Sequence, residues 1–203
     1  MHHLLDILAS GVHDAKNPLF IAESMLAADE TRRGIDLGEA RYAIEAAATR
    51  LSRTLAAYRL MREGAQLAIV PCIVGDLCDE VALAQAVHLK TQGITLTVDC
   101  KVFDPWPLDR DLLTDMLNNA VQNAGRYARS RIALSIFEDA AGLVMRVDDD
   151  GPGFPSLPPD KGIGLSVAER LAELHSRHQH TGQLLLNNDS ALGGARFELH
   201  LPR

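Results

Sequence analysis

Three acids followed by glycines form the first segment of this sequence that could do chemistry. The apolar run at residues 143–147 is typical of a buried strand, and three acids follow it directly: Asp148, Asp149 and Asp150. An acidic side chain at a strand end can accept hydrogen bonds from a donor-bearing ring such as adenine. Gly151 and Gly153 come next, and glycine lets a backbone pass close to a ligand or adopt a positive φ. Alone, this pattern also fits an ordinary turn.

A pair of asparagines upstream has the spacing of a cation site. Asn119 and Asn123 are four residues apart, so on a helix their amide oxygens share one face and can approach one hard cation. Mg²⁺ normally keeps water and phosphate oxygens as its other ligands. The alternative for this stretch is the polar face of an ordinary helix.

Two further segments could hold phosphate or a metal. Gly162 and Gly164 precede a predicted helix whose first-turn N–H groups can bind phosphate, although glycines also separate strands from helices without any ligand. Three histidines lie at the end of that helix and beyond it: His175, His178 and His180. They lack the spacing of ligands on a helix, so the sequence favours no metal there.

A histidine near the N-terminus is a candidate nucleophile. Asp14 can hold one imidazole nitrogen of His13 and accept its proton, which leaves the other nitrogen to attack. Asn17 lies four residues after His13, so both can address one site from the same helix face. On residue type alone, a histidine off the apolar seam of a helix is more often a solvated surface residue, and Asn17 could equally be one.

Taken together, these motifs resemble two known sets. Residues 119–127, 147–154, 162–167 and 193–197 resemble, in this order, the N, G1, G2 and G3 boxes of the GHKL ATPase family. Residues 13–19 resemble the H-box of two-component histidine kinases. The resemblance covers almost the whole chain and implies a histidine kinase core that uses ATP and Mg²⁺.

The H-box resemblance implies roles at the N-terminus. His13 would be the phosphoacceptor, Asp14 would assist its phosphorylation, and Asn17 would position water to dephosphorylate the partner, a response-regulator receiver domain.

The GHKL resemblance implies roles in the nucleotide site. Asn123 would be the magnesium ligand, and Asp149 would be the acid that reads adenine. The remaining residues assigned to the nucleotide are Asn119, Arg126, Tyr127, Gly151, Gly153, Gly162 and Gly164.

The sequence departs from the family pattern in the loop between Gly153 and Gly162. The family usually has a longer ATP lid with a phenylalanine pair there, whereas only Phe154 is present. Asp160 and Lys161 also stand where the G2 box begins with glycine. A short lid is expected to close less fully on the triphosphate.

Composition excludes several classes. A net charge of −7 without a basic cluster argues against a nucleic-acid partner. No apolar run approaches the ~20 residues that span a bilayer, and no signal peptide precedes the first helix, so no membrane contact is expected. The scattered cysteines are expected to be reduced core residues of a cytoplasmic protein: Cys72, Cys78 and Cys100. Only twelve residues precede His13, too few for a sensor domain within this sequence.

The N-terminal part, residues 1–64, is predicted to be a dimerisation and phosphotransfer domain. Residues 4–30 and 37–63 each carry an apolar seam at helical spacing, and Pro18 is expected to kink the first helix. Two such helices bury both seams best as a helical hairpin that pairs with a second copy in a four-helix bundle, so a homodimer is expected. An intrachain pair packed on the second domain is the alternative.

Residues 65–203 are predicted to form an α/β sandwich of the GHKL type. Helices are expected at 72–92, 109–127 and 162–175, and strands at 94–98, 132–138, 143–147, 184–187 and 196–201. Residues 64–71 are expected to be a linker, and Pro105 and Pro107 to interrupt regular structure. Helices on one face of a mixed sheet give the sandwich.

Two other functions compete with the kinase. A phosphotransfer adaptor would keep His13 and bind no ATP, which the short lid favours and the near-complete N and G1 boxes oppose. A GHKL switch protein kinase would need no phosphohistidine, which the H-box and the paired helices disfavour.

Overall fold

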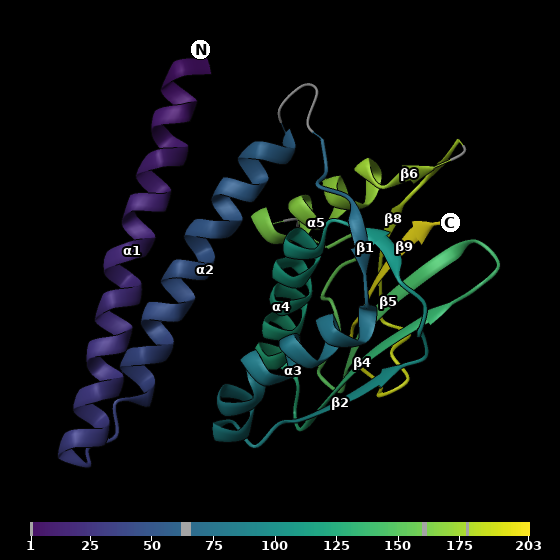
Figure 1. Ribbon diagram of the computed structural model, residues 1–203. Coiled ribbons are helices and arrows are strands. Elements are labelled where there is room, and N and C mark those ends of the chain that lie inside the picture. Colours follow the sequence, from purple (N-terminus) through teal and green to yellow (C-terminus); the bar gives the residue numbers. More distant parts are fainter. Residues whose placement is uncertain (1, 62–65, 160–161, 178) are drawn as a thin grey trace. The chain divides into compact units, whose positions relative to one another are not determined.

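The computed structural model describes residues 2–61, 66–159, 162–177 and 179–203 (Figure 1). The side chains of residues 2–17, 45, 49, 50, 52–59, 61 and 163 lie outside this description. The chain divides into two compact units, Met1–Arg59 and Leu60–Arg203.

The first unit consists of helices α1 (His2–Arg33) and α2, which spans Gly38–Met61 and continues beyond the unit boundary. Helix α1 continues through Pro18 and ends before Gly34. Gly34 adopts a φ of +64°, which glycine reaches without strain, and its N–H donates to the Glu30 carbonyl. Arg41 of α2 pairs with Glu23 at 2.7 Å and with Glu30 at 2.9 Å, both on α1. These ion pairs join the two helices on either side of the short turn.

The second unit is built on a five-stranded mixed sheet in the order β2-β4-β5-β9-β8. Its strands are β2 (Thr95–Cys100), β4 (Arg131–Glu138), β5 (Gly142–Asp149), β9 (Arg196–Pro202) and β8 (Gln183–Asn187). Strands β2 and β4 are parallel, and the other neighbours are antiparallel.

Three helices cover one face of this sheet: α3 (Val74–Thr91), α4 (Arg110–Tyr127) and α5 (Ile163–Leu174) (Figure 1). Alternate side chains of β4 point to this face, because successive residues of a strand face opposite ways. Ile132, Leu134 and Ile136 are fully buried there, whereas the residues between them are half-buried. The arrangement is the α/β sandwich that the sequence predicts.

Four short strands were not predicted from the sequence: β1 (Val70–Cys72), β3 (Trp106–Leu108), β6 (Ser176–Arg177) and β7 (His180–Thr181). They form two separate two-stranded sheets, and β1 replaces the end of the expected linker. Pro71 lies opposite Pro107. Because proline has no backbone N–H, neither residue can donate a hydrogen bond to the other strand, and such a pairing is tolerated only in a short pair of strands at an edge. The Trp106 indole N–H donates to Glu138 at 2.8 Å and so ties β3 to the main sheet.

Two composition-based expectations can be compared with the structure. Cys72 and Cys78 are buried, Cys100 is half-buried, and all three are free thiols. In the part of the chain that the structure describes, no helix combines the length and the apolar character needed to cross a membrane.

Candidate nucleotide site

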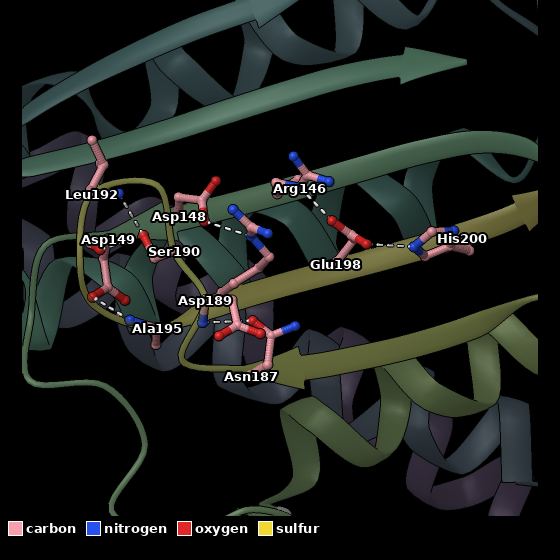
Figure 2. A network of polar contacts seen from close by, with 11 residues as sticks. Arg146, Asp148, Asp149, Asn187, Asp189, Ser190, Leu192, Ala195, Glu198 and His200 are labelled. Carbon is pink, nitrogen blue, oxygen red and sulfur yellow. Dashed lines mark hydrogen bonds and ion pairs between the residues drawn. The ribbon is translucent and has the colours of Figure 1, made fainter. Parts of the chain in front are cut away.

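The three consecutive acids at the end of β5 have different surroundings, and Figure 2 shows those of Asp148 and Asp149. Asp148 lies on the face of the sheet away from the helices, opposite Arg196 of β9, and accepts from the Arg196 Nε at 2.8 Å. Arg146, Glu198 and His200 continue this polar network along the same face, with Glu198 accepting from Arg146 and contacting His200 at 2.6 Å. Asp148 is therefore part of the outer face of the sheet.

Asp150 holds the turn between α4 and β4. Its Oδ1 accepts the backbone N–H groups of Arg129, Ser130 and Arg131 at 2.7, 3.0 and 3.1 Å, and its Oδ2 accepts the Ser130 hydroxyl at 2.8 Å. Burial raises the pKa of Asp150, but these bonds to the ionised form outweigh it and hold that pKa far below its usual range. Its hydrogen-bonding capacity is used within the fold.

Asp149 is oriented by backbone amides and is only 5% exposed. Its Oδ1 accepts from Gly151 N at 2.8 Å and from Ala195 N at 3.1 Å. Burial raises the pKa of Asp149, and the two amides counter this only in part. The result is a fixed, weakly solvated carboxylate at the end of a central strand, the geometry that hydrogen-bond recognition of a ligand requires.

The loop between β8 and β9 packs against Asp149. Ser190 Oγ and Gly194 N both donate to the Asp149 carbonyl, at 2.7 and 3.0 Å. A Cβ at Gly194 would lie 2.3 Å from Asp149 Oδ1, so only glycine fits there. The sequence places Gly194 in the G3 segment, but it is not among the residues that the sequence assigns to the site. Its pairing with Gly193 was the signal that could have identified it.

Helix α4 carries the asparagine pair. Asp109 caps the helix by accepting from Leu112 N at 3.2 Å, so the helix begins at Arg110. Asn119 is only 4% exposed and lies against the start of α5, where a Cβ at Gly164 would meet Asn119 Nδ2 at 2.3 Å. Asn123, one turn later, is half-buried.

Helix α4 ends beside the acidic strand end. Arg126 and Tyr127 are exposed on its last turn. A Cβ at Gly151 would lie 2.5 Å from the Tyr127 carbonyl oxygen, so Gly151 lets β5 pass close to the end of α4. The structure thus brings together, in one unit, residues that the sequence assigned to the N, G1 and G2 boxes.

Helix α5 begins after Gly162, which has no side chain to cap the first-turn N–H groups. A Cβ at Gly162 would meet open space, so the surrounding chain does not require glycine there. Gly153 has a φ of +81° and lies at the start of the loop that leads to α5. Asp160 and Lys161 lie outside the described residues.

The candidate phosphotransfer residues lie on α1. His13, Asp14 and Asn17 belong to this helix, and their side chains lie outside the description.

The histidines near the end of α5 show no metal site in the part of the chain that the structure describes. His175 donates from Nδ1 to the Leu171 carbonyl at 2.8 Å, and its Nε2 faces Asp109 N at 3.5 Å. No group of three metal-ligating side chains occurs among the described residues, and His178 lies outside them.

Comparison with known proteins identifies the family. Residues 108–203 match the model of the histidine kinase-, DNA gyrase B- and HSP90-like ATPases. The chain is 31% identical over 209 residues to the sensor protein kinase CarS of Pseudomonas aeruginosa, a match that covers 94% of this chain and 44% of CarS. The chain therefore spans less than half the length of this relative.

Solved structures share the fold. The ATP binding domain of PrrB from Mycobacterium tuberculosis has a TM-score of 0.56 and 27% identity, covering 66% of this chain and 97% of that one. The Acinetobacter baumannii histidine kinase AdeS has a TM-score of 0.64 and 16% identity, covering 94% of this chain and 97% of that one. The chain is a histidine kinase homologue whose residues 108–203 belong to the histidine kinase-, DNA gyrase B- and HSP90-like ATPase family.

Proposed function

We propose that this chain is a histidine kinase core that transfers the γ-phosphoryl group of ATP to His13, and from there to an aspartate of a response-regulator receiver domain. The observation that carries the proposal is the buried Asp149 carboxylate, held by two backbone amides within a domain of this ATPase family. The similarity to CarS, which extends over almost the whole chain, supports the inclusion of the N-terminal helices.

The residues around Asp149 fit the adenine end of a nucleotide. Its Oδ1 is engaged by backbone amides, so we assign Oδ2 as the acceptor for the exocyclic amine of adenine. Gly151 and Gly194 keep side chains away from this carboxylate. Gly153 belongs to the same turn.

Residues on α4 and α5 fit the phosphate end. We assign Asn123 as the ligand that would hold Mg²⁺, with Asn119 beside it on α4 and Arg126 and Tyr127 at the end of that helix. Bound Mg²⁺ would neutralise charge on the phosphates. The backbone N–H groups that follow Gly162, including that of Gly164, lie in the first turn of α5 and would hold phosphate oxygens.

The chemistry at His13 follows from its neighbours in the sequence. Asp14 accepts the proton of one imidazole nitrogen while the other attacks the γ-phosphorus. An N–P bond forms as the bond to the leaving ADP oxygen breaks, and catalysis is mostly positioning. Asn17, one turn after His13, would orient water when the phosphorylated receiver is hydrolysed.

A homodimer through α1 and α2 completes the proposal. Phe20, Ile21 and Met25 are 72%, 58% and 67% exposed, whereas Leu19, Ala22 and Leu26 of the predicted seam are half-buried. Helix α1 thus has a second apolar stripe beyond the seam. Large apolar side chains gathered on one helix favour a further helical partner, and a second copy of the same hairpin supplies one.

Calorimetric titration of the chain with ATP, with and without Mg²⁺, tests the proposal against the adaptor alternative. The kinase core binds ATP, and more tightly with Mg²⁺. Absence of ATP binding, together with labelling of His13 from a phosphorylated receiver, would instead establish the adaptor. Binding of ATP without any acid-labile label on the protein would establish the switch protein kinase.

A further inference from the structure

We propose that Asn188 is a positioning residue that clamps the backbone of Phe154, so that the β8–β9 loop holds both Asp149 and the start of the loop leading to α5. The inference rests on the proposed function in one respect only, the nucleotide that the clamped segment would serve. Its geometric part stands on contacts within the second unit.

The clamp has two hydrogen bonds. Asn188 Oδ1 accepts from Phe154 N at 2.7 Å, and Asn188 Nδ2 donates to the Phe154 carbonyl at 3.0 Å. A carboxamide carries one acceptor and one donor group side by side, as a peptide group does. Asn188 therefore pairs with Phe154 as a neighbouring strand would, at a place where no strand runs.

Gly153 provides the space for this clamp. A Cβ at Gly153 would lie 2.7 Å from Asn188 Oδ1 and 2.8 Å from its Cγ. Its φ of +81° is also a value that other residues rarely adopt. The absence of a side chain at Gly153 therefore leaves room for the Asn188 carboxamide.

The same loop holds the acid. Ser190 Oγ donates to the Asp149 carbonyl at 2.7 Å, and Ala195 N donates to Asp149 Oδ1 at 3.1 Å. Residues 188–195 thus contact the chain on both sides of the Gly151–Gly153 turn. A displacement of this loop would move the acid and Phe154 together, which makes Asn188 and Ser190 positioning residues for one site.

Amide exchange of Phe154, followed by NMR in the protein without nucleotide, tests the clamp directly. Losing one hydrogen bond to an exposed side chain is expected to speed exchange at Phe154 about fivefold in Asn188→Ala. Asn187→Ala is the matched control, because Asn187 Oδ1 accepts from Asp189 N at 2.9 Å and has no hydrogen bond to Phe154, so Phe154 exchange should be unchanged. Equal Phe154 exchange in wild type and Asn188→Ala overturns the proposal.

A double-mutant cycle provides the second measurement. Gly153→Ala loses stability both through its positive φ and through the clash with Asn188, and Asn188→Ala removes the clash. Gly153→Ala should therefore be less destabilising in the Asn188→Ala background, and equal losses in both backgrounds contradict the clamp. If Asn188→Ala does not fold, Asn188→Asp serves instead, since it keeps the acceptor for Phe154 N and loses the donor to its carbonyl.

Nucleotide titration separates this inference from the proposed function. With the clamp removed, the Kd for ATP should rise roughly two- to fivefold, because a smaller fraction of the molecules holds the loop in its binding position. If the wild-type protein binds no nucleotide, the proposed function fails while the exchange result still decides the clamp. If Asn188→Ala speeds Phe154 exchange but leaves the Kd unchanged, the positioning role toward the nucleotide is overturned.

Discussion

Replacing Asp149 with asparagine should weaken nucleotide binding without weakening the fold. Asparagine has one side-chain oxygen, which can accept from Gly151 N and Ala195 N as Asp149 Oδ1 does. Its NH₂ group then takes the place of Oδ2 and faces the adenine amine, donor against donor. In the opposite rotamer the NH₂ group faces the two backbone donors instead, so neither orientation satisfies every partner.

The size of the effect follows from the kind of bond lost. A hydrogen bond to a charged acceptor contributes about 1.5–3 kcal/mol, and 1.4 kcal/mol is about tenfold in Kd. The Kd of ADP and of ATP should thus rise roughly 10- to 100-fold. Because burial raises the pKa of Asp149, the fold disfavours its ionised form, and the neutral asparagine should leave Tm unchanged or higher.

Isothermal calorimetry with ADP and ATP, paired with thermal unfolding, measures both effects. Asp148→Asn is the matched control, since Asp148 lies on the opposite face of β5 and pairs with Arg196. It should lower Tm and leave the Kd unchanged. A Kd for Asp149→Asn equal to that of wild type, or an equal loss in Asp148→Asn, would refute the assignment of the adenine-reading acid.

Three further predictions concern the dimer, the metal and pH. Ile21→Glu should dissociate the homodimer with helix content unchanged, as read by light scattering and circular dichroism; a wild-type monomer at micromolar concentration would contradict it. Asn123→Ala should weaken ATP binding with Mg²⁺ present and much less without it; a loss independent of Mg²⁺ in calorimetric titrations would rule out the metal role. Burial lowers the pKa of His175 in the folded protein below that of a free histidine, about 6.5. The unfolded chain therefore takes up a proton more readily, so the stability is complete above about pH 6.5 and falls as the pH drops below it. His175→Gln should therefore reduce the drop in Tm between pH 7 and pH 5, and an unchanged drop would show that His175 does not cause it.

Periodic segments could be predicted from the sequence because their pattern is local. The helix of residues 109–127 and the strands of 132–138 and 143–147 have apolar residues at the spacing that one covered sheet face demands, and the structure places them within one or two residues. The strands β1 and β3 were missed because their prolines indicate interruption, and only pairing across more than thirty residues makes them strands.

The roles of the three acids could not be separated from the sequence. The glycine pair favours Asp149, but Asp148 and Asp150 flank it, so the pattern alone also allows a shift of one position. The pleat of β5 and the partners from residues 129–131 and 195–196 separate them, and these partners are distant in sequence. Asn188 had no signal at all, because a single exposed asparagine in a loop is unremarkable until Phe154 is placed beside it.

The most direct test of the kinase assignment is incubation of the chain with γ-labelled ATP and Mg²⁺, followed by acid and base treatment of the labelled protein. Wild-type protein should acquire a label that is labile in acid and stable in base, as expected for phosphohistidine, and should lose it to a response-regulator receiver. His13→Gln should acquire none while binding ATP with unchanged affinity. Labelling of His13→Gln at the wild-type level would contradict the assignment of His13 as the phosphoacceptor.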